Sequence, residues 1–155
     1  MDPLAYITWQ MKQESNAVGF IPRATVQNRY IAQGCYLLQR NSLNEPIGYL
    51  IHGRPKRGWP LHVHQVAIRI DHRRRLNATR LLRTLEGRAV HDGATCITLR
   101  CALDLEANQF WLASGFRLIS TTPGGSGRHR QIATYRLDLP TPTLSIGVSN
   151  AWNAL

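Results

Sequence analysis

The stretch LHVHQVAIRI at residues 61–70 alternates between apolar and polar residues, but the alternation changes phase part-way. The apolar positions are Leu61 and Val63 before the change, and Val66, Ile68 and Ile70 after it. Regular alternation predicts a β-strand with one buried face. A slip of one residue near His64 and Gln65 predicts a β-bulge, because one extra residue must be accommodated to keep the same face buried. We therefore expect a bulged strand; an ordinary strand with one irregularity is the alternative.

The segment after this strand has the spacing of an amphipathic helix. Its apolar residues, three or four apart, are Ala78, Leu81, Leu82, Leu85 and Ala89. Gly93 is expected to end the helix, and TCITLRC at residues 95–101 is expected to be a buried strand. A strand, a helix and a parallel strand in this order are typical of an α/β fold, whose ligand site lies at the carboxyl ends of the strands.

The rest of the chain predicts further helices and strands around this unit. Residues 22–34 have helical spacing between Pro22 and Gly34, and residues 35–52 predict a β-hairpin. A short helix ending at Gly115 and two strands joined by a glycine-rich basic loop follow, whereas residues 4–15 fit a helix or a strand equally well. We expect one α/β domain over residues 1–139, with a central mixed, twisted sheet, a bulged strand and flanking helices. Residues 140–155 are expected to be a Pro/Ser/Thr-rich tail.

The charge of the chain favours an anionic partner. The formal net charge is +10 over 155 residues, and Lys12 and Lys56 are the only lysines beside many arginines. A guanidinium group binds phosphate or carboxylate through paired hydrogen bonds, so nucleic acid or a phosphorylated cofactor is expected. A bias in codon composition explains the preference for arginine over lysine equally well, but it does not explain the net charge.

The cysteines and the hydropathy pattern indicate the cellular compartment of the protein. Cys35, Cys96 and Cys101 lack the spacing of metal ligands, so no metal is expected, and free thiols indicate a reducing compartment. No apolar run approaches the roughly 18 residues that a membrane span needs. The N-terminus has no basic segment before an apolar stretch, as a secretory signal would. We expect a cytoplasmic protein without a membrane segment.

The stretch DHRRRLNATRLL at residues 71–82 leads three arginines directly into the predicted helix. The first N–H groups of a helix have no intrahelical partner, and the helix dipole adds positive potential there, so an anion is stabilised at this end. Three interpretations are open on these residues alone: a phosphate-binding corner for a nucleotide cofactor, a contact to nucleic acid, or a solvated turn.

Two motifs, in order and between correctly alternating strands and helices, resemble the GNAT acyltransferases over residues 19–139. The family has Arg/Gln-x-x-Gly-x-Gly/Ala between a bulged strand and a helix, and this chain has RRRLNA, with Leu76 in place of the first glycine. The second motif contains Asn, Ala and Tyr and ends in Gly-Phe. In DLEANQFWLASGF, Asp104 replaces the asparagine and Trp111 the tyrosine.

The resemblance implies acetyl-CoA or another acyl-CoA as the cofactor. In the family, pantetheine lies along the bulged strand and the pyrophosphate binds at the helix start, while the tyrosine of the second motif often protonates the departing thiolate. The positions that match this cofactor site are Val66, Ala67, Ile68, Arg73, Arg74, Arg75, Leu76, Asn77, Ala78 and Trp111. An indole N–H only donates a hydrogen bond, so Trp111 does not fill the role of that tyrosine.

Other residues are therefore candidates for the acid and base of acyl transfer. Tyr49 and Tyr135 are candidates for the acid, with a packed core tyrosine as the alternative in each case. His64, together with His62 two residues before it, is a candidate base, since imidazole titrates near neutral pH. Asp104 is expected either to cap the following helix or to contribute to the acceptor pocket.

The acceptor is expected to be a nucleobase in DNA. The chain is similar in type to small Mom-like phage enzymes that modify adenine in DNA, which would place it in the host cytoplasm. A basic loop and a basic arm are expected to form one nucleic-acid surface, consisting of Arg54, Lys56, Arg57, Trp59, Arg128 and Arg130. The alternatives are an acetyltransferase of a small amine or protein, or an inactive GNAT-fold binding module. A homodimer is left open.

Overall fold

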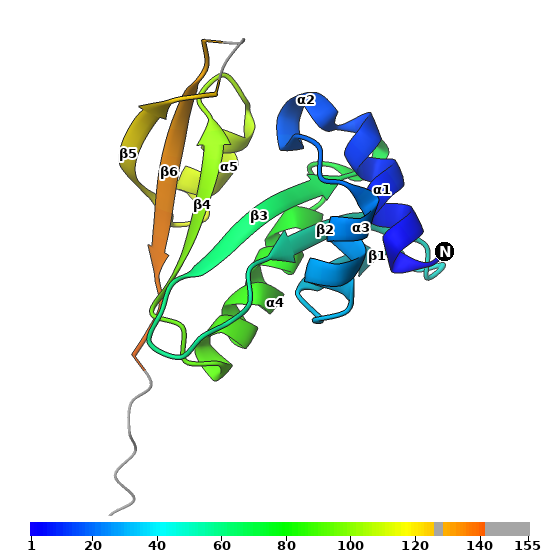
Figure 1. Ribbon diagram of the computed structural model, residues 1–155, viewed down its shortest axis with the longest axis horizontal. Helices are drawn as coiled ribbons and strands as arrows, with labels where there is room; N and C mark the ends of the chain where they lie inside the picture. The colour runs from blue at the N-terminus through cyan, green and yellow to red at the C-terminus, as the bar shows by residue number, and fades with distance from the viewer. Residues whose placement is uncertain (126–128, 142–155) are drawn as a thin grey trace, which may run out of the picture.

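The computed structural model describes residues 1–125 and 129–141 of the chain and shows one mixed sheet between helices (Figure 1). The predicted tail beyond residue 141 and the candidate Arg128 lie outside the described residues. The sheet has six strands in the order β1-β2-β3-β4-β6-β5. Their bounds are Tyr36–Arg40 (β1), Pro46–His52 (β2), Leu61–Ile68 (β3), Cys96–Ala102 (β4), Arg117–Pro123 (β5) and Gln131–Asp138 (β6).

The helices lie on both faces of this sheet (Figure 1). Their bounds are Pro3–Gln13 (α1), Ser15–Val18 (α2), Arg23–Thr25 (α3), Val26–Ile31 (the π-helix η1), Ile70–His72 (the 3-10 helix η2), Asn77–His91 (α4) and Ala107–Ala113 (α5). One face carries α4 and α5, and the other carries the N-terminal helices over β2 and β3. Within the described residues, no helix is long and apolar enough to span a membrane.

The ends of the helices follow from local sequence. Asp2 begins α1, since its carboxylate accepts a hydrogen bond from the N–H of Ala5 and Pro3 occupies the first turn. Gly93 follows α4 and Gly115 follows α5, both with positive φ, as predicted. The predicted helix over residues 22–34 is present from Arg23 to Ile31 and is followed by a turn that reaches Gly34, but its second half has π geometry, which residue spacing did not reveal.

The predicted bulge lies at His64. Gln65 of β3 is opposite Ile51 of β2, whereas Val63 is opposite His52, so His64 is the extra residue. Strand β3 pairs with the parallel strand β4 only over Leu61–Val63. After the bulge the two strands separate, and their carboxyl halves border an opening in the middle of the sheet (Figure 1).

Two apolar clusters, one on each face of the sheet, pack the helices against it. The larger lies between the sheet and α4 and α5 and includes Leu82, Leu85 and Ile97, while the smaller lies between the sheet and the N-terminal helices and includes Ile7 and Tyr49. Strand β3 contributes side chains to both clusters: Leu61 and Ile68 to the larger and Ala67 to the smaller. The bulge allows Leu61 and Ile68 to lie on the same face of the sheet. The α/β fold predicted from the sequence is confirmed.

Candidate functional site

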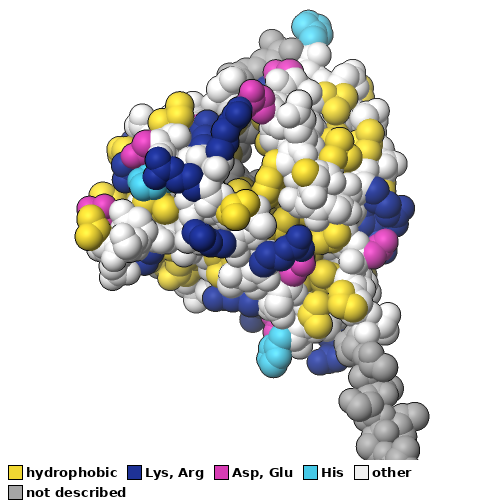
Figure 2. Space-filling view, turned by 180° about the vertical axis from the view of Figure 1, so that it is seen from behind, with side chains coloured by type: hydrophobic (Ala, Val, Ile, Leu, Met, Phe, Trp, Pro, Cys, Tyr) yellow, Lys and Arg dark blue, Asp and Glu magenta, His cyan; other side chains and the backbone are white. Residues whose placement is uncertain are grey.

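The opening between β3 and β4 is a cleft of about 720 Å³. Figure 2, which views the molecule from behind, shows this side hollowed, with Lys and Arg side chains along one rim. Four parts of the chain line it: residues 14–18 at and within α2, the edge of β3 from Val66 to Ile68, the loop and first turn of α4, and residues 104–111 around α5. Most of the candidate cofactor residues predicted from the two sequence motifs therefore line the same cleft.

The first turn of α4 forms one wall of the cleft. The first intrahelical bond runs from the N–H of Arg80 to the carbonyl oxygen of Leu76, which leaves the N–H groups of Asn77, Ala78 and Thr79 without intrahelical acceptors. These three residues line the cleft. An anionic group in the cleft is therefore stabilised by free N–H donors and by the positive end of the helix dipole.

Leu76 takes the left-handed conformation, with φ of 61° and ψ of 10°. Glycine adopts this conformation without steric cost, whereas a residue with a Cβ atom loses roughly 1–2 kcal/mol. This explains why the matching position in the family carries glycine. The side chain of Leu76 is 67% exposed, so the substitution adds apolar surface to the rim of the cleft and does not fill its interior.

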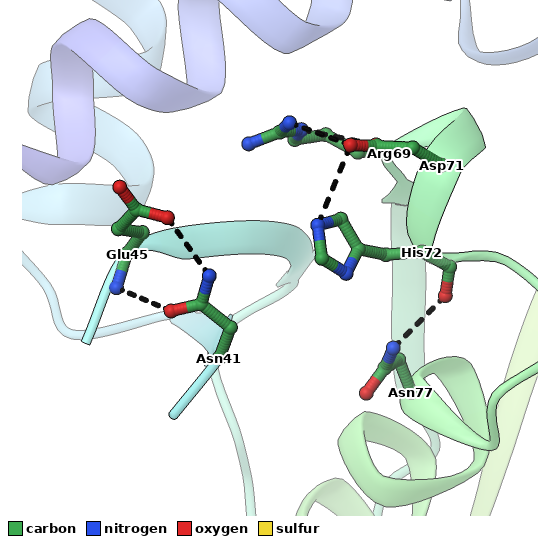
Figure 3. A network of polar contacts seen from close by, with 6 residues as sticks. All are labelled: Asn41, Glu45, Arg69, Asp71, His72 and Asn77. Carbon is green, nitrogen blue, oxygen red and sulfur yellow. Dashed lines mark hydrogen bonds and ion pairs between the residues drawn. The ribbon is translucent and has the colours of Figure 1, made fainter. Parts of the chain in front are cut away.

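The loop before α4 is held by polar contacts (Figure 3). The side-chain amide of Asn77 donates to the carbonyl oxygen of His72, and the carboxylate of Asp71 binds both Arg69 and the imidazole of His72. Asn77 is buried, so this bond fixes the loop against the start of the helix. The first turn of α4 is thus positioned in advance of any ligand.

The three arginines of this loop differ in what they contact. Arg73 donates to the carbonyl oxygen of Ile68 and to the carboxylate of Glu14, so it ties β3 to the N-terminal helices. Arg74 lines the cleft and is 87% exposed, with only a long contact of 3.8 Å to Glu106. Arg75 is exposed but is not among the residues that line the cleft. Arg74 is therefore the arginine best placed for a phosphate.

Trp111 is buried at the inner end of the cleft. Its ring meets Phe110 and Phe116 edge to face, with centroids 4.9 and 5.4 Å apart. It also lies beside the thiol of Cys101, whose pKa is raised mainly by burial. Trp111 supplies an apolar wall, and nothing in its surroundings gives it a proton to transfer.

The two candidate tyrosines lie in the core. Tyr49 donates from its hydroxyl to the side-chain oxygen of Gln65, and Tyr135 donates to that of Asn108. Burial raises the pKa of both hydroxyls, and neither residue lines the cleft. This geometry favours the alternative of packed core tyrosines over a catalytic acid.

The two histidines of β3 share the face opposite α4, as expected from their spacing. Their rings are 5.2 Å apart between centroids. Nδ1 of His64 is hydrogen-bonded to the hydroxyl of Tyr30, and Nδ1 of His62 to the hydroxyl of Thr98 at 2.9 Å. Burial is the largest cause that lowers the pKa of His64, to about 4, and neighbouring cationic groups add to it. Burial also lowers the pKa of His62, so for both imidazoles the surroundings favour the neutral form.

Asp104 does not cap α5, so the first of its two expected roles is wrong. The residue before the helix is Glu106, which makes no side-chain capping bond. The carboxylate of Asp104 instead accepts two hydrogen bonds from Nε of Arg130, at 2.9 and 3.1 Å, and it lines the cleft. Arg130 also donates to the carbonyl oxygen of Asn16, so this pair closes one end of the cleft against α2.

The basic loop and Arg130 do not form one surface, which corrects the expectation from the sequence. Trp59 contacts the start of β4 through the bond from the N–H of Thr95 to its carbonyl oxygen, and Lys56 lies over its ring at 4.5 Å. Arg130 precedes β6, whose first residues pair with the end of β4. The two segments thus lie at opposite ends of β4, because β6 runs antiparallel to it. Arg54 and Arg57 belong to the Trp59 end, where Arg57 packs on Gly93.

Sequence comparison identifies the family. The model of the acetyltransferase (GNAT) family matches residues 4–116, most of the chain. The chain belongs to this family. As a GNAT protein it is an acyl-CoA-dependent N-acyltransferase, and the expected class of enzyme and cofactor is confirmed. A search of curated proteins found no significant match.

Solved structures with low sequence identity share the fold of this GNAT protein. Ard1 from Thermoplasma volcanium is 12% identical with a TM-score of 0.77, over 88% of this chain and 91% of that one. NAA60 from Arabidopsis thaliana, in complex with a bisubstrate analogue, is 12% identical with a TM-score of 0.76, over 91% and 96%. An aminoglycoside 6'-N-acetyltransferase complexed with coenzyme A is 13% identical with a TM-score of 0.71, over 91% and 94%.

Sequence patterns missed the residues that orient the histidines. Tyr30 lies in the π-helix and Thr98 on the far side of the parallel pairing, so each reaches its histidine across a long sequence separation. The only local signal was that Tyr30 falls at a core position of the predicted helix. The partner of a buried polar group is decided by the register of strands, which one sequence does not contain.

The core role of Tyr49 is testable by removing its hydroxyl. Tyr49→Phe leaves the side-chain oxygen of Gln65 without its donor in the core, so the free energy of unfolding should fall by about 1–3 kcal/mol. Urea denaturation measures this, and Tyr36→Phe at a half-buried position is the control. The rate of acyl transfer should be unchanged. A loss of kcat by a hundredfold with normal stability would instead make Tyr49 catalytic.

The strained position of Leu76 gives a second test. Leu76→Gly removes the side chain from the rim of the cleft and relieves the left-handed strain, so coenzyme A should bind more tightly in calorimetry. The unfolding free energy should stay within about 1 kcal/mol, because glycine also gains entropy in the unfolded chain. Leu43→Gly, at an exposed turn outside the cleft, should leave the affinity unchanged. Weaker binding of coenzyme A to Leu76→Gly would show that the leucine contributes a favourable contact.

Proposed function

We propose that this GNAT enzyme holds an acyl-CoA in the cleft between β3 and β4 and acylates an amine presented on the sheet face that carries His62 and His64. The observation that carries the proposal is one cleft that joins the free edge of β3 to the N-terminal turn of α4. The cleft opens beyond the point where the bulge ends the β3–β4 pairing, and its first lining residue on β3, Val66, follows His64 by two positions.

The residues that line the cleft fit the cofactor. The N–H groups of Asn77, Ala78 and Thr79, with the guanidinium of Arg74, provide donors and positive charge for phosphate groups. The unpaired edge of β3 from Val66 to Ile68 offers backbone groups to an extended amide chain, as an added strand would use them. A bound acyl-CoA supplies the acyl group as a reactive thioester.

His64 is proposed to accept the proton of the attacking amine. Its imidazole is neutral, and its Nδ1 is fixed by the hydroxyl of Tyr30, a buried residue of the π-helix. His62 lies next to it, held by Thr98. A base with a lowered pKa takes protons weakly from an ammonium group, so it suits an amine that is already neutral.

The first candidate acceptor is a nucleobase in DNA. Burial is the largest cause that lowers the pKa of both histidines. The next cause is Arg100 for His62, and His62 followed by Arg29 for His64. A surface with this positive potential repels protonated amines and attracts a polyanion. The exocyclic amine of a base is neutral and is carried by such a polyanion, so it matches both properties of the histidine face.

The second candidate is a small amine or the amine of a protein. Three carboxylates, of Glu14, Asp104 and Glu106, line the cleft and would attract a cationic acceptor. Glu14 is paired with Arg73 and Asp104 with Arg130, whereas Glu106 has only a contact of 3.8 Å to the exposed Arg74. The charge of Glu106 therefore supports a cationic acceptor as the second candidate.

The acceptor is decided by product analysis. Purified protein, acetyl-CoA and single-stranded DNA should give an acetylated nucleoside by mass spectrometry after enzymatic digestion. His64→Gln should lower its formation by about a hundredfold or more, because general-base catalysis contributes that much. His91→Gln, at the end of α4, is the matched control. Acetylation of small amines without any modified nucleoside would establish the second candidate.

The lowered pKa of His64 also predicts how stability depends on pH. The folded-state pKa of about 4 lies below the ordinary 6.5, so the unfolded state binds more protons between these values. The free energy of unfolding should therefore fall as the pH drops from about 6.5 to 4. Urea denaturation at pH 7 and pH 5 should show a smaller loss for His64→Gln than for wild type or His91→Gln. An equal loss in all three proteins would contradict this assignment.

A further inference from the structure

Among the helices of residues 1–125 and 129–141, none covers one face of the half-sheet made by β4, β6 and β5 (Figure 1). Helix α5 packs on the other face with Trp111 in the larger core cluster, and the N-terminal helices pack on β2 and β3. Most residues of the uncovered face are arginines and hydroxyl-bearing side chains, and Ala102 and Ile132 add a small apolar area at one end: the polar set is Thr98, Arg100, Arg117, Ser120, Thr122, Thr134 and Arg136. Apolar packing therefore does not account for this surface.

Strand register arranges these side chains in rows. His62 is opposite Thr98, Thr98 is opposite Arg136, and Arg136 is opposite Arg117, so one row runs from the imidazole to the edge of the sheet. With strands about 4.8 Å apart, the row is roughly 14 Å long. A second row beside it runs from Arg100 through Thr134 to Ser120. The arginines thus lead away from the proposed base.

The charge of this face is mainly positive. Arg117 and Arg136 share one carboxylate, that of Asp138. Arg100 contacts the hydroxyl of Thr122 at 3.4 Å. Arg29 adds positive charge from the neighbouring π-helix, where it lies 5.9 Å from the ring of Tyr30. Among the described residues of this face, the three arginines Arg100, Arg117 and Arg136 thus stand against one acid, Asp138.

We propose that the uncovered face of β4, β6 and β5 binds a single-stranded nucleic acid and presents one unstacked base to His62 and His64. This inference rests on the proposed function and names where its acceptor lies. Phosphates bind Arg100, Arg117 and Arg136, and the threonine hydroxyls donate further hydrogen bonds to the backbone. A single strand is specified because a base within a duplex is stacked and cannot reach the histidines.

The experiment compares salt dependence between matched variants. Affinity for a fluorescent single-stranded oligonucleotide is measured from 50 to 300 mM salt for wild type, for Arg100→Gln/Arg136→Gln and for Arg40→Gln/Arg83→Gln. Both double variants lose two charges, but Arg83 lies on α4 and Arg40 at the end of β1. Each phosphate contact on a single strand contributes about 0.7 to the slope of log affinity against log salt. The first variant should therefore lower the slope by about 1.4, and the second should keep it.

A charge-retaining variant keeps the test valid if the glutamines disturb folding. Arg100→Lys/Arg136→Lys should keep most of the slope, because lysine also neutralises a phosphate. Equal slopes in the two glutamine variants, or tighter binding of duplex than of single strand, would overturn the inference. Modified nucleosides with an unchanged slope would place the acceptor on another surface. If the wild-type protein does not bind coenzyme A, the proposed function itself is refuted.

Discussion

The bulge at His64 is the constraint on which the site depends. Without it, β3 would continue its parallel pairing with β4 and close the sheet. With it, the strand adds one residue, keeps Leu61 and Ile68 in the same core, and turns its carboxyl half away. The same irregularity therefore opens the cleft for the cofactor and places His62, His64 and Gln65 on the opposite face. One inserted residue couples the position of the cofactor to that of the proposed base.

The sequence predicted the parts of this arrangement that local physics controls. Alternation located the bulge to within a residue, and the glycines at 93 and 115 ended their helices because a left-handed residue is needed there. Contacts across long separations were not predictable. The partners of Tyr49 and Tyr135, and the use of Arg73 to tie β3 to Glu14, depend on how elements pack, so the burial of the two candidate tyrosines could not be predicted from the sequence.

The positions of the basic residues relative to one another were also not predictable from the sequence. Net charge indicates an anionic partner but does not say where the charges meet. The loop at Trp59 and the residue Arg130 lie at opposite ends of β4 because β6 is antiparallel to it. The arginines that do align, Arg117 with Arg136 across β5 and β6, are far apart in sequence and were hidden among other strand residues. The register of the paired strands determines which basic residues lie side by side on one surface.

Electrostatics connects the two faces of the molecule. On the α4 side, free N–H groups and Arg74 provide positive potential for an anionic group, while on the other side burial is the largest cause that lowers the pKa of both histidines, and Arg100 and Arg29 add to it. A neutral base in positive surroundings is poorly suited to lysine-like amines, which must first lose a proton at high pKa. It is suited to an amine that is neutral and attached to a polyanion. These positive surroundings are the reason why we propose a neutral amine on a polyanion as the acceptor.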